Sequence, residues 1–184
     1  MEKIQISWNQ KSDPYRGDLL VSGYASVFDV IDNHNDIIVK GSFSTTIQNN
    51  RKNIKFLWQH DPKFPIGKIT KIFEDIYGLY IEACITSGTE KGREAIDLLS
   101  KNIINGLSVG FKSINSYTNA EGRRVITELD LWEISMVTFP SNQQSEIHNK
   151  HIEKSLLISA LEEAKFQISL INQRSKNGCS NKGS

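Results

Sequence analysis

The sequence predicts an α+β fold, in which a mainly antiparallel, closed or nearly closed β-barrel is surrounded by a few helices and followed by a C-terminal amphipathic helix. Three observations lead to this expectation. Most segments before Pro140 are rich in strand-forming residues and are bounded by turn residues. Strand and helix patterns do not alternate regularly, as they would in a doubly wound parallel sheet. After Pro140 the composition becomes polar and then helical.

Strands are expected wherever apolar and polar residues alternate or β-branched and aromatic residues gather. They cover residues 4–8, 19–28, 53–59, 68–73, 79–85, the segment around Ser108, and 125–140. Gly23 inside the second of these predicts a bulge or a close backbone approach. Pro62 and Pro65 argue against a continuous central strand through residues 61–67.

Two internal helices are expected. A short one falls within residues 41–50, where Phe43 and Ile47 are four residues apart and share a face. The clearer one spans residues 86–102. Its capping box is Ser87 with Glu90, and its apolar stripe consists of Ala95, Ile96 and Leu99.

The C-terminal part divides into a polar linker, an amphipathic helix over 151–173 and a small, polar tail that we expect to be disordered. The expected domains are therefore 1–146 for the main domain, 147–173 for the helical segment and 174–184 for the tail. The helix either covers the barrel or forms a coiled-coil or scaffold-binding arm.

Composition limits the classes of partner. The chain has 184 residues, with 22 basic and 21 acidic side chains and a net charge of +1, which argues against nucleic acid or an anionic membrane as the main partner. Cys84 and Cys179 have the spacing of neither a zinc site nor a disulfide framework, and they fit a reducing, cytoplasmic setting. No apolar run approaches membrane length, and the N-terminus has no signal-peptide stretch.

Ser108 lies between Gly106 and Gly110, in the G-x-S-x-G spacing of the hydrolase nucleophile elbow. The order Ser108, Asp130, His148 also matches the triad order of that fold. The elbow requires a helix directly after the serine, however, and a strand and a turn follow here. On a strand, the two glycines and Ser108 share one face. They either leave room for a substrate backbone beside a nucleophile or pack tightly, with Ser108 merely hydrogen-bonded.

A serine nucleophile needs a base, and His60 is the best-placed histidine. It ends an apolar strand in phase with Phe56 and Trp58, and the ordinary histidine pKa of about 6.5 suits general-base catalysis. The alternative is an ordinary half-buried histidine. Glu133 lies at a strand centre between apolar residues, so its carboxylate needs a partner.

That partner of Glu133 is either a histidine ring or one of the arginines Arg123 and Arg124. Asp130 is the competing carboxylate for the role of orienting a base. The two arginines could also assist at a reacting oxyanion through a bound water or their charge.

Five stretches together resemble one family, the prohead maturation proteases of tailed bacteriophages. They are "SGYASVFDVIDNHNDIIVKGSF", "FLWQHDPKFPIGKI", "GLYIEACI", "INGLSVGF" and "LWEISMVTFPSN", and they cover about residues 20–146. The family is similar in fold to the herpesvirus assemblins, serine proteases with a β-barrel surrounded by helices. The resemblance implies Ser108 as nucleophile, His60 as base and Glu133 as third member, where the assemblins use a second histidine. His34 and Asp36 are then expected to build a loop.

The resemblance also implies a function, namely a serine endopeptidase that cleaves scaffold, coat protein and itself during prohead maturation. Its implied partners are the phage major capsid protein and scaffold, with a homodimer or higher homo-oligomer possible, and without nucleic acid, membrane, metal or cofactor. It would act in the host bacterial cytoplasm, inside the immature prohead, with a self-cleavage site expected after Pro140. Two alternatives are a catalytically inactive head-assembly or scaffolding module of the same fold, and an unrelated ester hydrolase that uses Ser108, Asp130 and His148.

Overall fold

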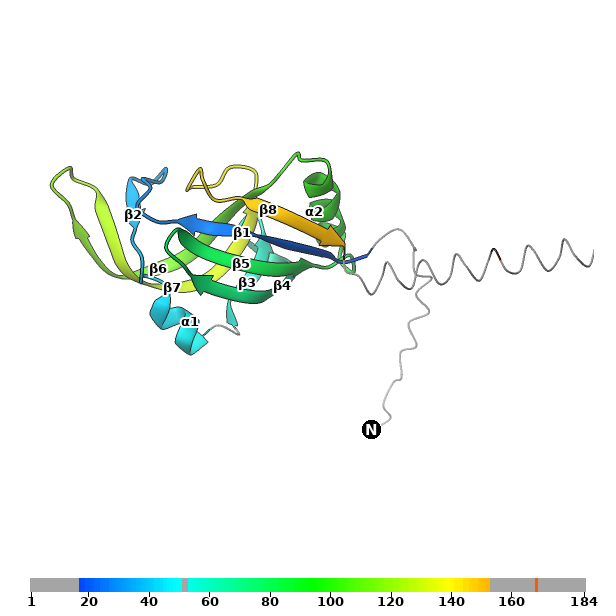
Figure 1. Ribbon diagram of the computed structural model, residues 1–184, viewed down its shortest axis with the longest axis horizontal. Coiled ribbons are helices and arrows are strands. Elements are labelled where there is room, and N and C mark those ends of the chain that lie inside the picture. Colours follow the sequence, from blue (N-terminus) through cyan, green and yellow to red (C-terminus); the bar gives the residue numbers. More distant parts are fainter. Residues whose placement is uncertain (1–16, 51–52, 153–167, 169–184) are drawn as a thin grey trace, which may run out of the picture. The chain divides into compact units, whose positions relative to one another are not determined.

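The computed structural model describes residues 17–50, 53–152 and 168, and the helices and strands lie in the two long ranges (Figure 1). The elements in chain order are β1 Leu19–Val27, β2 Asp36–Ile38, α1 Ser44–Asn50, β3 Lys55–Trp58, β4 Asp61–Glu74, β5 Gly78–Ile85, α2 Glu90–Ser100, β6 Gly106–Thr118, β7 Arg124–Val137 and β8 Ile147–Ile152. One compact unit covers Asp18–Glu153.

The strands form one mixed sheet that curves into an open half-barrel (Figure 1). Its order is β2-β7-β3-β4-β5-β1-β8, and β6 pairs with the opposite edge of β7. Both β2 and β3 run parallel to β7, whereas the other pairs are antiparallel. The expectation of an antiparallel, closed or nearly closed barrel is therefore wrong. Alternation of apolar and polar residues identifies a strand but not the direction of its partner, which is why the sequence pattern did not reveal the parallel pairs.

The half-barrel stays open because the contact between its two ends is short. Near the start of β8, the amide of Leu107 donates to Ser145 and the amide of Ile147 donates to Asn105. A single bridge joins Gly106 and Glu146, and among the described residues the pairing does not continue along β6.

β4 runs without interruption through both of its prolines, but as the expectation requires it is not a central strand there. Its pairing with β5 begins only at Gly67, so residues before that point have a neighbouring strand on one side only. Pro62 and Pro65 lie in this stretch, which is exposed over residues 62–65. Proline lacks an amide donor, and a segment paired on one side can accommodate it.

Two other local predictions can be compared with the structure. A side chain at Gly23 would collide with the backbone of Glu146 and come within 2.8 Å of the Ile147 Cα, which confirms the expected close approach. Helix α2 is confirmed, but its N-cap is Thr89, whose side chain accepts a hydrogen bond from the amide of Gly92, and not the expected Ser87.

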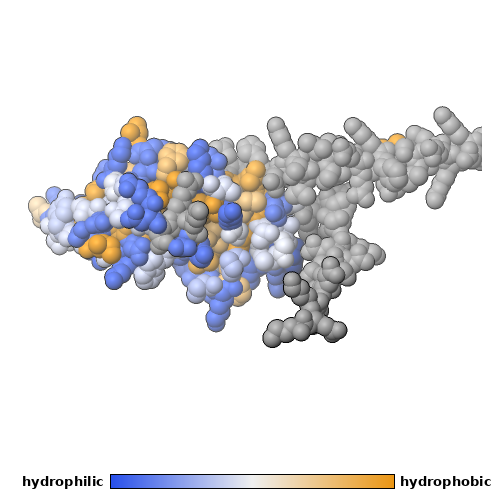
Figure 2. All heavy atoms as spheres, turned by 90° about the horizontal axis from the view of Figure 1, so that it is seen from below, coloured by the Kyte–Doolittle hydropathy of each residue, from blue (hydrophilic) through white to orange (hydrophobic). Residues whose placement is uncertain are grey.

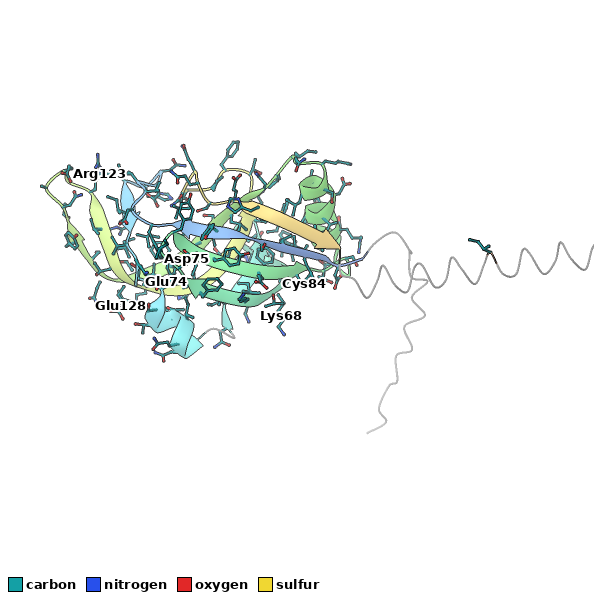
Figure 3. All side chains as sticks on the ribbon, in the orientation of Figure 1. Lys68, Glu74, Asp75, Cys84, Arg123 and Glu128 are labelled. Carbon is teal, nitrogen blue, oxygen red and sulfur yellow. The ribbon has the colours of Figure 1, made fainter. Side chains whose placement is uncertain are left out.

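Glu74, at the end of β4, fixes the residues that lead into α1 (Figure 3). Its carboxylate accepts hydrogen bonds from the amides of Gly41 and Phe43 and from the Ser44 hydroxyl. Phe43 is fully buried and Ile47 packs against the same core, so the predicted shared face is confirmed.

The core is made of apolar side chains contributed by the sheet, α1 and α2. Fully buried members include Phe56, Ile66, Leu79, Ile81, Leu99, Leu107, Ile126, Leu131 and Ile134. On the face seen in Figure 2, hydrophilic residues are interspersed with smaller hydrophobic patches.

The segment after Pro140 is not a linker over its whole expected length. The Asn142 side chain donates to the carbonyl of Val27, and residues 147–152, which we assigned to the start of the C-terminal helical segment, form β8 along β1. Apart from residue 168, the remainder of the expected helix lies outside the described residues, as do the expected tail and the expected strand 4–8. No described helix is long and apolar enough to span a membrane.

Candidate active site

The tight turn between β3 and β4 carries His60. Trp58 pairs with Asp61, and the two residues between them, Gln59 and His60, have φ angles of 52° and 60°. Two positive φ angles are the signature of a type I′ hairpin turn. Histidine tolerates this left-handed region better than most side chains, although each such residue costs about 1 kcal/mol or more. The imidazole is therefore placed by a short, strained and well-defined turn.

The His60 imidazole meets the Glu133 carboxylate. Nδ1 of His60 lies 2.6 Å from Oε1 of Glu133. The histidine side chain is 42% exposed and the glutamate side chain 13% exposed, so the pair lies at the boundary between core and solvent. Of the partners considered for Glu133, the structure thus selects a histidine ring.

Ser135 links the same two residues a second time. Its hydroxyl donates to Oε2 of Glu133 at 2.6 Å and accepts from the backbone amide of His60 at 3.0 Å. Ser135 is fully buried. Sequence reasoning missed this residue, although the Glu-x-Ser spacing on one strand, which puts both side chains on one face, was a signal that could have found it.

Ser108 lies directly across from Ser135 in the antiparallel pair of β6 and β7. Side chains of such opposite residues are on the same face with Cβ atoms about 4.5–5.5 Å apart. Ser108 is 4% exposed and lines the same cavity as His60. No direct hydrogen bond joins the Ser108 hydroxyl to His60 in this structure, and a serine and a base of a catalytic site need not be in contact before substrate binds.

The two glycines beside Ser108 have different neighbours. Gly110 pairs with Glu133, and a side chain there would collide with the Glu133 carboxylate, coming within 2.8 Å of its Cδ and 2.9 Å of its Cγ. A side chain at Gly106 would meet the Val137 carbonyl and Pro140 at 2.8 and 2.9 Å. The space at Gly110 thus holds the carboxylate and not, as one interpretation had it, a substrate backbone.

A cavity of about 380 Å³ opens beside His60 and Ser108. Its wall continues through β1, the loop before β2, β2 itself, the start of β7 and the residues after Pro140. It combines apolar side chains with a charged end, at which Asp36 and Arg124 meet. Its position beside both side chains makes it the candidate substrate cleft.

Asp36 and Arg124 form a two-pronged ion pair. Nε of Arg124 donates to Oδ1 of Asp36 at 2.8 Å, and a second guanidinium nitrogen donates to Oδ2. The hydrogen bond to Asp36 raises the pKa of Arg124. Asp36 is buried within β2 and is therefore not the loop-building residue we expected. The loop is organised by Asp32 instead, whose carboxylate accepts from the amides of His34 and Asp36.

The structure does not bring together the residues of the rival esterase hypothesis. Asp130 accepts a hydrogen bond from the Trp132 indole, and the His148 ring lies edge-on to Tyr24 at 5.8 Å. Neither lines the cavity beside Ser108. Arg123, at the tip of the β6–β7 hairpin in Figure 3, does not line it either.

Comparison with known sequences places this site in context. The profile of the caudovirus prohead serine proteases matches residues 7–157. The chain is 30% identical over 148 residues to the prohead protease of Enterobacteria phage HK97, covering 77% of this chain and 66% of that protein. It is 28% identical over 137 residues to the prohead protease of Escherichia phage T5, covering 73% and 64%. The chain thus spans slightly less than two thirds of each relative.

A shorter match joins 102 residues, 51% of this chain, to 15% of the capsid polyprotein of Pseudomonas phage PAJU2, at 30% identity. Two solved structures share the fold at 13% identity. The bacteriophage T4 capsid assembly protease has a TM-score of 0.53 and covers 64% of this chain and 81% of its own. The protease of KSHV, in complex with a hexapeptide phosphonate inhibitor, has a TM-score of 0.50 and covers 77% and 68%.

Proposed function

Because the chain belongs to the caudovirus prohead serine protease family, we propose that it is a serine endopeptidase of capsid maturation with Ser108 as nucleophile, His60 as general base and Glu133 as the acid that orients the base. One observation carries this assignment of roles. The imidazole of His60 contacts the Glu133 carboxylate at 2.6 Å and lines the same cavity as Ser108.

In the proposed reaction, Oγ of Ser108 attacks the carbonyl carbon of the scissile peptide bond, and Nε2 of His60 takes the hydroxyl proton. The tetrahedral intermediate collapses, the C–N bond breaks, and His60 returns the proton to the leaving amine. Water then attacks the acyl-enzyme, again with His60 as base, and releases the second product and Ser108. Glu133 keeps the Nδ1 proton in place and stabilises the imidazolium.

The proposed substrates are the scaffold and major capsid proteins of the same phage, together with the protease itself. The prohead proteases of phages HK97 and T5 and the match to a capsid polyprotein support this choice. The proposed place of action is the inside of the immature prohead, in the host cytoplasm. A homodimer or higher homo-oligomer remains a prediction.

The test is coexpression of the full chain with the major capsid protein of its phage, followed by mass spectrometry of the fragments. We expect Ser108→Ala to abolish cleavage. Ser116→Ala is the matched control, since Ser116 is an exposed serine on the same strand and does not line the cavity. Continued cleavage by the Ser108→Ala protein contradicts the assignment of the nucleophile. Absence of cleavage by the unaltered protein, under conditions in which proheads mature, favours the inactive assembly module.

A further inference from the structure

His60 and Glu133 are joined twice, once directly and once through the Ser135 hydroxyl. The His60 amide donates to Ser135 Oγ, this hydroxyl donates to Oε2 of Glu133, and Oε1 of Glu133 lies against Nδ1 of the same His60. The hydrogen bonds thus form a closed ring that begins and ends on one histidine. We propose, on the basis of the proposed function, that Ser135 and Gly110 are positioning residues that hold the Glu133 carboxylate against Nδ1 of His60.

Ser135 controls the orientation of the carboxylate. A serine hydroxyl has a single hydrogen, and here it points to Oε2 because Oγ already accepts the His60 amide. Oε2 is thereby engaged, and Oε1 is left for the imidazole. The hydrogen bond from the His60 amide also fixes the backbone of the strained turn that carries the imidazole. A fully buried hydroxyl with these two partners has no alternative arrangement without an unsatisfied polar group.

Gly110 controls the place of the carboxylate. The Glu133 side chain lies across the Cα of Gly110, in the space where any other residue would have its Cβ. The atoms that such a Cβ would meet, namely Oε1, Cδ and Cγ, form the end of a flexible side chain. Gly110→Ala therefore displaces the carboxylate and leaves the strands in place.

The consequence for the reaction concerns the histidine tautomer. A carboxylate at Nδ1 keeps the proton on that nitrogen, and Nε2 is then the free acceptor for the Ser108 proton. When the carboxylate turns away, the neutral ring can carry its proton on Nε2, where it cannot act as a base.

The first test measures how fast a fluorophosphonate modifies Ser108 in the full chain. In this reaction Oγ of Ser108 forms a P–O bond, the P–F bond breaks, fluoride leaves and His60 takes the hydroxyl proton. We expect Ser135→Ala and Gly110→Ala each to lower the rate about 10- to 100-fold, the usual effect of losing a hydrogen bond to a charged group.

Two matched controls accompany these variants. Ser145 is as buried as Ser135, but its hydroxyl has no hydrogen-bond partner among the described residues. Ser145→Ala therefore removes a buried hydroxyl without removing any hydrogen bond between His60, Ser135 and Glu133. For Gly88, the nearest atom to an added Cβ is the Thr86 hydroxyl at 3.3 Å, so Gly88→Ala adds a methyl group away from the site. Both controls are expected to react within about twofold of the unaltered protein. A change of this size is smaller than the effect of losing one hydrogen bond.

Two readouts separate positioning from a general loss of structure. In a Glu133→Gln background, Ser135→Ala is expected to cause no further loss of rate, because residues that act through one group are not additive and the hydroxyl that fixes the orientation of the glutamine amide is then absent. In ¹⁵N-labelled protein, the ring nitrogens of His60, assigned with His60→Ala, are expected to shift toward the Nε2–H tautomer in both single variants.

The outcomes distinguish the two proposals. Modification of the Ser108→Ala protein at the unaltered rate overturns the proposed function. An unreactive Ser108→Ala protein, together with Ser135→Ala and Gly110→Ala proteins that react as fast as the unaltered chain, overturns the positioning proposal alone. Equal rate losses for Ser135→Ala with and without Glu133→Gln also overturn it, because Ser135 would then act independently of the carboxylate.

Discussion

Replacing Glu133 by glutamine tests how the His60 base is oriented. The substitution exchanges one carboxylate oxygen for an NH2 group and changes nothing else. The side chain keeps its size, so it still fits over Gly110. Ser135 donates its single hydrogen to Glu133, and the carbonyl oxygen of the glutamine is the only part that can accept it. The amide nitrogen then faces Nδ1 of His60, and its N–H groups require that nitrogen to be an acceptor. The ring proton consequently moves to Nε2.

The size of the effect follows from these contacts. Turning the amide over restores the productive tautomer but leaves the buried Ser135 hydroxyl hydrogen without an acceptor, at a cost of about 1–3 kcal/mol. Losing the charge that stabilises the imidazolium costs about 1.5–3 kcal/mol more. Together these terms predict a decrease in kcat/KM of about 10²- to 10⁴-fold.

The assay is the initial rate of cleavage of purified capsid protein, with the unfolding midpoint measured in parallel. A Glu133→Gln protein that folds normally and cleaves within threefold of the unaltered protein would refute the reasoning. Such a result would mean that His60 does not depend on the carboxylate for its tautomer.

Three further predictions concern stability and pH. Arg124→Ala removes the partner of the buried Asp36 carboxylate, so the free energy of unfolding in urea is expected to fall by about 1–3 kcal/mol, and an unchanged value would show that solvent replaces the arginine. Leu79→Ala, at a fully buried position that does not line the cavity, is expected to cost about 2–5 kcal/mol in the same measurement without changing the fluorophosphonate rate of the folded protein. The hydrogen bond to Asp75 raises the pKa of Tyr24 to about 12, above the usual value for tyrosine of 10.0. The folded state thereby favours the neutral phenol of Tyr24. The stabilisation that results from this preference is complete below pH 10 and is lost as the pH rises toward 12. The difference in unfolding free energy between the unaltered and Tyr24→Phe proteins should shrink over that range, and a constant difference would contradict it.

Residue type and neighbouring sequence predicted that Glu133 needs a partner, but left a histidine ring and two arginines as candidates for it. Glu133 needed a partner because apolar residues flank it, and the structure provides His60. The expected phase of His60, however, is wrong. It was placed with Phe56 and Trp58 by counting along a strand, whereas the positive φ angles at Gln59 and His60 turn the ring toward the side of Glu133. Alternation along a strand cannot predict such a turn.

The register of β6 against β7 was a second feature that the sequence did not reveal. Gly110 pairs with Glu133 but Phe111 pairs with Leu131, so Trp132 is an extra residue in the strand, and its side chain is 57% exposed. One bulge of this kind reverses the assignment of faces on one side of it. The contact between Gly110 and Glu133 depends on that register, and so could be recognised only from the structure.

The parallel pairs also come from long-range arrangement. β2 and β3 both lie along β7, which follows them by more than 60 residues in the chain. The sequence pattern predicted β3 as a strand without fixing its partner, and it did not predict the short strand β2. The sequence was sufficient to locate most of the described strands. It was insufficient to predict which strands pair, and in which direction, around the site.

The most direct test of the proposed mechanism is the site of covalent modification by a fluorophosphonate, mapped by mass spectrometry in the unaltered and His60→Ala proteins. A serine that depends on a neighbouring imidazole should carry the phosphonate at Ser108 in the unaltered protein, with the His60→Ala protein largely unmodified under the same conditions. Modification of another residue in place of Ser108, or equal modification of Ser108 in both proteins, would contradict it.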